Sequence, residues 1–169
     1  MPRTARKAPG GMVFHVLNRG VGTHVRRWQA HYHEVGHGHL YQGRFKSFPV
    51  QENGHFLTVA RYVERNAPRA RQVQRAEIWR WSSLWQRVQG SAKERAMLSD
   101  WPVARPADWV NYVNEPQTDA ELAELRLSIS KGRPFGAAEW QREMASRLGL
   151  RSCFAVPGRP RNPATPELS

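Results

Sequence analysis

Residues 53–66, NGHFLTVARYVERN, carry the pattern that most restricts what this chain can fold into. Apolar side chains recur there at spacings of three and four, which predicts an amphipathic helix with one buried stripe. Asn53 is the expected N-cap of this helix, and Pro68 is expected to end it, because the residue before a proline avoids the α conformation. The stripe consists of Phe56, Val59, Ala60 and Val63.

A polar edge runs along the same helix beside the stripe. Its four members follow one another at offsets of three, four and four, so at about 100° per residue they fall within an arc of roughly 60–80°. We therefore expect an imidazole, a hydroxyl, a phenol and a carboxamide to share one half-buried edge of the helix. These residues are His55, Thr58, Tyr62 and Asn66.

Tyr62 has two interpretations. The ordinary one is an aromatic residue at the margin of the core, whose hydroxyl finds a hydrogen-bond partner. In the other, its phenol is a nucleophile for a phosphodiester; this needs a metal ion or cations close by, because a free phenol has a pKa of about 10. Asn66 offers an amide oxygen of the kind that binds Mg²⁺ or Mn²⁺. The available cations are Arg61, Arg65 and Arg69.

The charge of the chain favours nucleic acid as a partner. The net charge is +12, and residues 1–75 hold 13 Lys and Arg against 3 Asp and Glu, whereas residues 76–169 hold 13 against 11. Arginine dominates, and its planar guanidinium suits phosphate oxygens. A basic half of this kind indicates nucleic-acid binding, with a basic surface that binds nothing as the alternative.

Two strands are predicted ahead of the helix. Residues 11–20 alternate with apolar side chains on both faces, which predicts a central strand covered on both sides, and His15 is interpreted as a core histidine rather than a metal ligand. Residues 40–50 predict a second strand with a cationic face formed by Arg44 and Lys46. Pro49 restricts this strand to an edge or places the proline at its end.

Residues 23–36, between the two strands, predict a short helix. Two His-x-His strings lie in and just after it, but a helix points residues i and i+2 in different directions, and the second string lies in a glycine-rich loop. Neither setting favours a metal site, although both remain candidates. The four histidines are His31, His33, His37 and His39.

The second half of the chain is predicted to be helical. Residues 78–90 predict a turn and a short helix capped by Ser82 or Ser83, with their tryptophans as a small core and base stacking as the alternative. A weak helix is expected at 106–113. A second helix is expected to begin at the capping box of Thr118 and to end at Gly132, and a third is expected over 137–148. These last two form either a packed helical hairpin or, loosely, a helix-turn-helix. The three tryptophans are Trp79, Trp81 and Trp85.

The location of the protein is suggested by what the sequence lacks. There is no run of 18 apolar residues and no signal-peptide pattern, so no membrane association is expected. The single cysteine, Cys153, leaves no internal disulfide and no cysteine-based zinc site. We therefore expect a reduced, cytoplasmic protein.

Several segments together resemble the REP-associated tyrosine transposases, which are single-tyrosine transposases of the HUH class. The resemblance covers most of residues 2–155 in order, and its most specific part is the tyrosine-to-proline string that follows the GRFKS strand. The segments are HVLNRG (15–20), GHGHLYQGRFKSFPV (36–50), HFLTVARYVERNAPRA (55–70), WRWSSL (79–84) and LSDWP (98–102).

This resemblance implies a reaction on DNA. In that family a tyrosine attacks a phosphodiester of single-stranded, hairpin-bearing DNA and forms a 5′-phosphotyrosine link. A divalent metal, Mg²⁺ or Mn²⁺, polarises the phosphate and is held by two histidines of an H-hydrophobic-H strand and by an amide or similar group on the tyrosine helix. By position, Tyr62 resembles the nucleophile and Asn66 the third metal ligand. The expected DNA-binding residues are Arg19, Arg44, Lys46, Arg61, Arg65 and Arg69.

The chain departs from the family at the metal-binding histidines. Gly22 is followed directly by Thr23, where family members carry the strand with the HUH motif, and the His31–His33 string lies in the segment that resembles the helix after it. We therefore expect a catalytically impaired, DNA-binding member of the transposase family, with a non-catalytic binder of structured nucleic acid as the alternative.

The expected fold is α+β. The resemblance implies a remnant of a ferredoxin-like antiparallel sheet with helices, followed by a helical C-terminal extension. The expected divisions are a truncated catalytic-like domain at 1–90, the extension at 91–155 and a disordered tail at 156–169, which is poor in apolar residues. A monomer and a homodimer are both compatible with the sequence.

Overall fold

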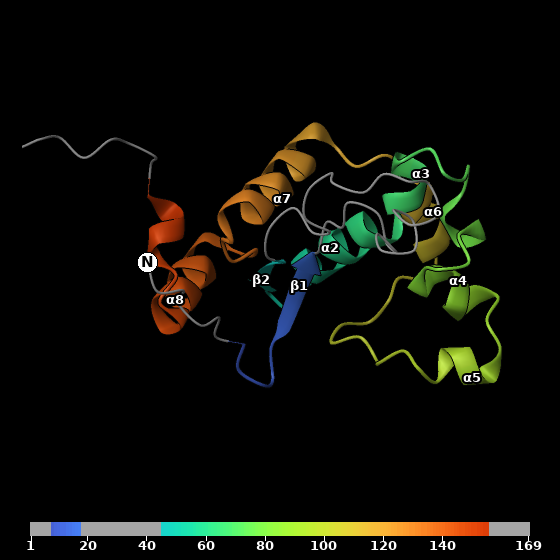
Figure 1. Cartoon of the computed structure of the whole chain (residues 1–169), viewed down its shortest axis with the longest axis horizontal. Coiled ribbons are helices and arrows are strands. Elements are labelled where there is room, and N and C mark those ends of the chain that lie inside the picture. Colours follow the sequence, from blue (N-terminus) through green and yellow to red (C-terminus); the bar gives the residue numbers. More distant parts are fainter. Residues whose placement is uncertain (1–7, 18–44, 156–169) are drawn as a thin grey trace, which may run out of the picture.

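A computed structural model describes residues 8–17 and 45–155 of the chain. The two strands form an antiparallel sheet, and most of the other described residues are helical (Figure 1), so the predicted α+β class is confirmed. In chain order the elements are β1 (Val13–Leu17), β2 (Lys46–Val50), α2 (Gly54–Glu64), α3 (Asn66–Arg69), η1 (Ala76–Ile78), α4 (Ser83–Val88), α5 (Ala92–Arg95), α6 (Trp109–Asn114), α7 (Asp119–Lys131), α8 (Ala138–Leu148) and η2 (Arg151–Phe154).

Several predictions fall on residues outside these ranges. They are the helix at 23–36, the first part of the second strand, the tail at 156–169, and the predicted site residues Arg19, Arg44, His31, His33, His37 and His39. Within the described ranges, no helix is long and apolar enough to cross a membrane.

One face of the two-stranded sheet forms the first core. The register pairs Val13 with Val50 and His15 with Phe48, which places these alternate residues on one face. Phe48 and Val50 are buried there together with residues from α2 and α7. The prediction that β1 is covered on both sides is wrong, because Val16 on the other face is 58% exposed. In the described part of the chain only two strands pair, and on the face of β1 that carries Val16 no described apolar side chain buries this residue.

The edge of β2 away from β1 is occupied by Phe135, in the segment between α7 and α8. The amide N–H of Phe135 donates to the carbonyl of Pro49 at 2.9 Å, and that of Gln51 donates to the carbonyl of Phe135 at 2.9 Å. Pro49 is the fourth of the five residues of β2, and among the described residues β2 is an edge strand of a two-stranded sheet, as predicted for a strand with this proline. Phe135 adds an isolated bridge on its outer edge. The proline is tolerated there because the contact with Phe135 uses the proline carbonyl and not the missing N–H.

The helix that carries Tyr62, α2, begins where the sequence predicts. The side chain of Asn53 accepts a hydrogen bond from the backbone N–H of His55 at 2.9 Å, so the predicted N-cap is confirmed. The helix ends at Glu64, and Asn66 begins the separate helix α3, which contains Pro68. A proline cannot donate to the carbonyl four residues back but is accepted in a first turn, which explains a new helix here.

The buried stripe of α2 differs from the prediction. Val59 is buried, but Val63 is 45% exposed, so its assignment to the stripe is wrong. Arg61 and Glu64 are buried instead, at 4% and 3% exposure. Their side of α2 meets polar atoms from the second half of the chain, and these make hydrogen bonds that allow the charged groups to be buried.

A second core joins α2 to the segment around α4 and α6. Leu84, Trp109 and Val113 are buried there with Ala76, and Trp101 packs edge-on against Trp109 with ring centroids 4.9 Å apart. The prediction that the tryptophans near α4 form a core is wrong for Trp81, which is 78% exposed. Ser82 caps α4, as expected, so Trp81 precedes the helix and only Leu84 of its first turn is fully buried.

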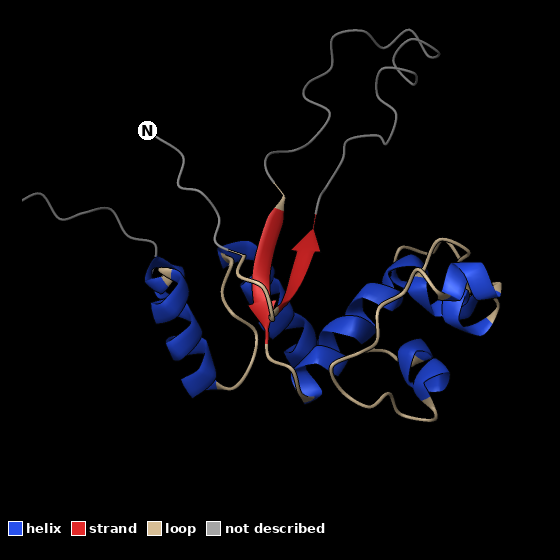
Figure 2. Ribbon diagram, turned by 90° about the horizontal axis from the view of Figure 1, so that it is seen from below, coloured by secondary structure: helices blue, strands red, loops and turns tan. Residues whose placement is uncertain are grey.

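The helices of the second half follow their sequence signals. Thr118 and Glu121 form the predicted capping box of α7, and Gly132 ends that helix in the left-handed conformation with φ of 65°. The predicted helix over 137–148 is α8, which buries Met144 and Leu148. Figure 2 shows helices on either side of the two strands, which form the only sheet among the described residues.

Candidate nucleic-acid interface

Tyr62 lies near the end of α2 and is half-buried against the first core. Its ring meets the ring of His15 edge-on, with centroids 6.3 Å apart. The guanidinium carbon of Arg69 lies 3.9 Å from the centroid of the Tyr62 ring, which is a cation–π contact. The phenol is therefore at the margin of the core with a cation beside it, which is compatible with both interpretations of this tyrosine.

Arg69 also contacts Asn66. Its Nη2 donates a hydrogen bond to Oδ1 of Asn66 at 2.9 Å. The break after Glu64 places Asn66 on α3 rather than on the tyrosine helix, and Arg69 links the two predicted site residues. We call Tyr62, Asn66 and Arg69 the tyrosine cluster. Both Asn66 and Arg69 are exposed, so a ligand can reach the cluster from solvent.

The described residues do not by themselves form a site for the divalent metal implied by the family resemblance. The amide oxygen of Asn66, which is the atom a metal would take, already accepts from the cationic Arg69. No group of three or more His, Cys, Asp or Glu residues that could hold a metal occurs within residues 8–17 and 45–155. The histidines of the two His-x-His strings lie outside these ranges.

Arg61 is placed in the interior, not on the predicted DNA-binding surface. Its Nη2 donates to the carbonyls of Glu115 at 3.0 Å and Pro116 at 3.2 Å. Its Nη1 lies 3.8 Å from a carboxylate oxygen of Glu121, and its guanidinium stacks 3.9 Å from the centroid of the Tyr112 ring. The side chain thus holds the connection between α6 and α7 against α2.

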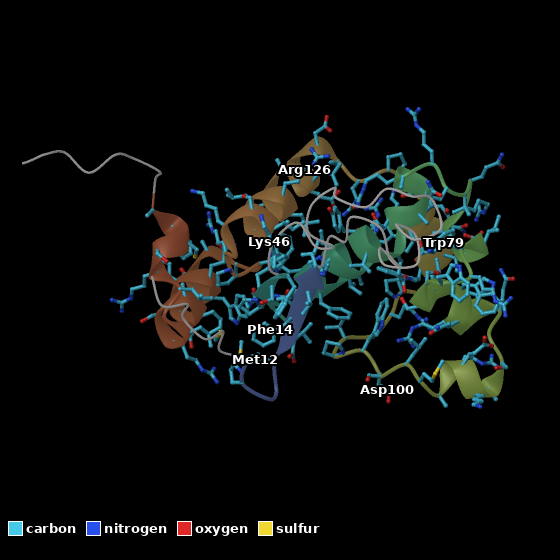
Figure 3. All side chains as sticks on the ribbon, in the orientation of Figure 1. Met12, Phe14, Lys46, Trp79, Asp100 and Arg126 are labelled. Atoms are coloured by element: carbon cyan, nitrogen blue, oxygen red, sulfur yellow. The ribbon has the colours of Figure 1, made fainter. Side chains whose placement is uncertain are left out.

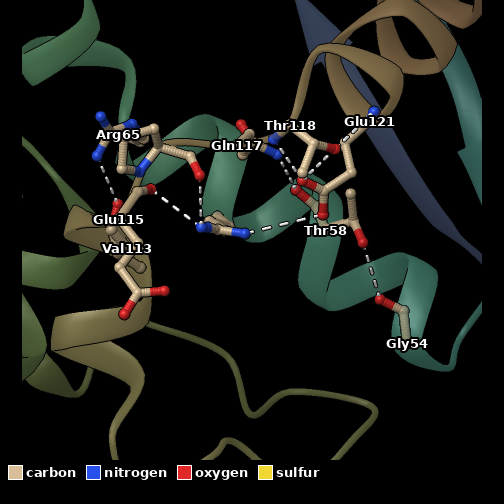
Figure 4. Close-up of polar contacts among 10 residues, drawn as sticks. Gly54, Thr58, Arg65, Val113, Glu115, Gln117, Thr118 and Glu121 are labelled. Carbon is tan, nitrogen blue, oxygen red and sulfur yellow. Dashed lines mark hydrogen bonds and ion pairs between the residues drawn. The ribbon is translucent and has the colours of Figure 1, made fainter.

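Arg65 also faces this connection. Its Nη1 donates to the carbonyls of Val113 and Asn114, which otherwise end α6 without partners (Figure 4). Burial lowers the pKa of its guanidinium, and the neighbouring Arg61 and Arg69 lower it further. Of the three arginines predicted on this stretch, only Arg69 is exposed. Lys46 is exposed too, but it lines a different groove, of about 650 Å³, between the strands and the ends of α7 and α8.

His15 lies against Tyr62 and Phe48, as expected for a core histidine. Its Nε2 is buried and has no hydrogen-bond partner among the described residues. Burial lowers the pKa of the imidazole from 6.5 to about 4. The neutral form is therefore the one packed beside the tyrosine cluster at neutral pH.

The low pKa of His15 predicts a loss of stability in acid. The unfolded chain takes up this proton near pH 6.5 and the folded chain near pH 4, so the free energy of unfolding falls as the pH drops between these values. With a discount for partial exposure, the expected loss is about 1–3 kcal/mol. Urea unfolding at pH 7 and pH 4.5 measures it, and His15→Leu, which cannot be protonated, should lose less over this interval. An equal loss in both proteins would contradict the prediction.

A groove of about 330 Å³ opens beside Asn66. It is lined by the end of α2 and by α3 on one side and by the turn before α4 on the other, and we call it the tryptophan groove. Trp79, labelled in Figure 3, belongs to the turn between η1 and α4 and lines this groove. The exposed Val63 is one of its lining residues, which accounts for the break in the apolar stripe of α2. Its lining residues are Val63, Glu64, Asn66, Ala67, Ala70, Gln72, Trp79, Trp81, Ser82 and Ser83.

Two cations near this groove were not singled out from the sequence. Arg80 lies 5.9 Å from the ring centroid of Trp81 and 5.7 Å from that of Trp85. Arg71 is exposed and has φ of 56°, a left-handed conformation that costs a non-glycine residue roughly 1–2 kcal/mol. The signal that could have found Arg80 is its position between two tryptophans, in the string Trp79-Arg80-Trp81. The strain at Arg71 has no sequence signal.

Comparison of the chain with models of protein families, with curated proteins and with solved structures finds no match.

Proposed function

We propose that this protein binds single-stranded DNA at the tyrosine cluster and is a shortened relative of the REP-associated tyrosine transposases. The observation that carries the proposal is the contact of one exposed arginine, Arg69, with both Tyr62 and Asn66. A guanidinium held beside a phenol and a carboxamide is suited to a phosphate oxygen, because all three groups form hydrogen bonds with it and the arginine supplies opposite charge. The net charge of +12 supports an anionic partner.

The same proposal assigns the fold to that family. The sheet of β1 and β2 with α2 against it is taken as the remnant of a ferredoxin-like sheet, and α6, α7 and α8 as a helical C-terminal extension. Hairpin-bearing DNA is the proposed ligand form, since the quoted segments resemble enzymes that act on it. These assignments rest on the motifs, and the DNA-binding experiments test them.

In the strand-transferring form of this proposal, the Tyr62 oxygen attacks the phosphorus of a phosphodiester and forms a 5′-phosphotyrosine link. The bond from phosphorus to the 3′ oxygen breaks, the released strand takes up a proton as a free 3′-OH in exchange for the one lost by the phenol, and Arg69 offsets charge on the phosphate. A divalent ion, Mg²⁺ or Mn²⁺, would supply further charge stabilisation in such a reaction. Incubation of the protein with a labelled hairpin oligonucleotide in Mg²⁺ or Mn²⁺ should then give a covalent protein–DNA adduct that Tyr62→Phe abolishes. No adduct in either metal would limit the protein to binding.

A second candidate is a non-catalytic binder of structured single-stranded nucleic acid. One contact favours it: Arg69 occupies the amide oxygen of Asn66 that metal binding would require. This candidate predicts the same affinity for Tyr62→Phe as for the wild type, together with no adduct. It agrees with the expectation that the copy is catalytically impaired.

Binding should depend strongly on salt and on Arg69. For single strands, the slope of log K against log salt is about −0.7 per phosphate contacted, so loss of one contact in Arg69→Ala should make the slope less steep by about 0.7. Fluorescence anisotropy with a labelled hairpin oligonucleotide between about 50 and 200 mM salt measures both slopes. Arg126→Ala is the matched control, because Arg126 is exposed on α7. Equal slopes for the Arg69 variant and the wild type, or binding that does not respond to salt, would contradict the proposal.

A further inference from the structure

The tryptophan groove has a volume and an exposed apolar lining that a phosphate contact at Arg69 does not explain. Its volume of about 330 Å³ lies at the lower end of the roughly 300–1,000 Å³ found for small-molecule sites. Trp81 on its wall is 78% exposed although it is the largest kind of apolar side chain. An exposed indole next to another apolar residue that is exposed, Val63, indicates a surface with a partner rather than a packing residue.

The charge around the groove selects the class of partner. Arg80 lies within cation–π distance of Trp81, and the exposed Arg71 stands between Ala70 and Gln72, which line the groove. The one carboxylate in the lining, Glu64, is 3% exposed and accepts hydrogen bonds from Ser83 and Trp109 inside the protein. Flat aromatic surface with arginines at the rim is the combination that holds bases and phosphates of single strands.

Asn66 adds a directional group to the same groove. Because Arg69 donates to its Oδ1, the carboxamide is oriented with its oxygen engaged, and its Nδ2 makes no hydrogen bond within the described part of the chain. This NH₂ group can donate to an acceptor on a ligand. Every nucleobase carries such acceptors as ring nitrogens or carbonyl oxygens, so the contact suits a base without selecting a particular one.

We propose that the tryptophan groove holds one unpaired nucleobase, stacked on Trp81, from the strand whose phosphates contact Arg69 and Arg80. The inference rests on the proposed function and adds to it a base site that adjoins the tyrosine cluster. Asn66 belongs to both places and connects them: its oxygen is held by Arg69 and its nitrogen donates to the base. Deoxyribose and ribose strands carry the same base chemistry, so both are tested.

The experiment compares a labelled oligothymidylate with the same oligonucleotide carrying abasic residues, using anisotropy on the full chain. The wild type should bind the abasic strand about tenfold more weakly, since stacking on one aromatic residue contributes roughly 1–3 kcal/mol per base. Trp81→Ala should weaken binding of the intact strand by about the same factor and leave binding of the abasic strand unchanged. Trp81→Phe, which keeps an aromatic face, should recover most of the loss. An oligouridylate arm shows whether ribose strands are bound as well.

Met97→Ala is the control for loss of an exposed apolar side chain. Met97 is 66% exposed and lies just after α5, outside the groove lining. Equal affinity of the wild type for intact and abasic strands would overturn the base site and leave DNA binding at Arg69 standing. Equal affinities of Trp81→Ala and wild type for the intact strand would also overturn it. Failure of the wild type to bind either strand would overturn the base site, and failure to bind the labelled hairpin oligonucleotide as well would overturn the proposed function with it.

Discussion

Arg61→Ala should lower the free energy of unfolding by about 3–4 kcal/mol. Arg61 is 4% exposed, and its guanidinium has four partners: two backbone carbonyls after α6, the Tyr112 ring and the Glu121 carboxylate. A hydrogen bond to a charged group contributes about 1.5–3 kcal/mol, and removal of the donor leaves buried carbonyls unpaired. Urea unfolding followed by circular dichroism at neutral pH measures the change.

Two further variants separate the geometry of Arg61 from its charge. Arg61→Lys keeps the charge but lacks the planar fork that reaches two carbonyls and stacks on Tyr112, so it should recover only a minor part of the loss. Arg69→Ala removes an exposed arginine from the next helix, with its contacts to Tyr62 and Asn66, and should change stability by no more than about 1 kcal/mol. A loss for Arg61→Ala as small as that for Arg69→Ala would show that Arg61 does not hold the α6–α7 connection.

The difference between these two arginines could not be read from the sequence. Periodicity classes every arginine as polar, so Arg61, Arg65 and Arg69 were predicted together as cations for DNA. Which one turns inward depends on the carbonyls that the end of α6 brings to α2 from some fifty residues further along the chain. Long-range partners of this kind leave no local pattern.

Predictions from local sequence signals are more reliable than those that depend on long-range partners. The N-cap at Asn53, the capping box at Thr118 and the stop at Gly132 each depend on a few neighbouring residues, and all three are confirmed. The break at Glu64 was misplaced by two residues, because the rule used for Pro68 concerns the residue before the proline. The missing N–H acts four residues back, and that is where α2 ends.

The sequence predicts that Tyr62 and Asn66 lie close together, but the structure connects them in a different way. They were expected one turn apart on a single helix, whereas Asn66 begins α3 and Arg69 makes the connection. Trp81 was assigned to a core because tryptophans close in sequence usually pack together. The second core instead recruits Trp101 and Trp109, which come later in the chain, and leaves Trp81 exposed in the groove.

Glu64→Ala should be the other strongly destabilising substitution, with an expected loss of about 2–4 kcal/mol. The carboxylate is 3% exposed and accepts from the Ser83 hydroxyl at 2.6 Å and from the Trp109 indole N–H at 2.7 Å. The alanine variant leaves both donors without this partner and leaves a cavity at the joint between α2, α4 and α6. Thermal and urea unfolding measure the loss.

The Glu64 carboxylate and the Trp109 indole should be energetically coupled, and a double-mutant cycle tests this. Glu64→Gln keeps the shape but offers one oxygen where two donors need one each, so it should cost about 1–2 kcal/mol alone. Trp109→Phe removes the indole N–H. In that background one oxygen suffices for Ser83, so the further cost of Glu64→Gln should fall below its cost in the wild type by about 1 kcal/mol. Glu124→Gln, an exposed change on α7, should stay within about 0.5 kcal/mol. Strictly additive losses would mean that the carboxylate and the indole do not act together, and that Glu64 is held by Ser83 alone.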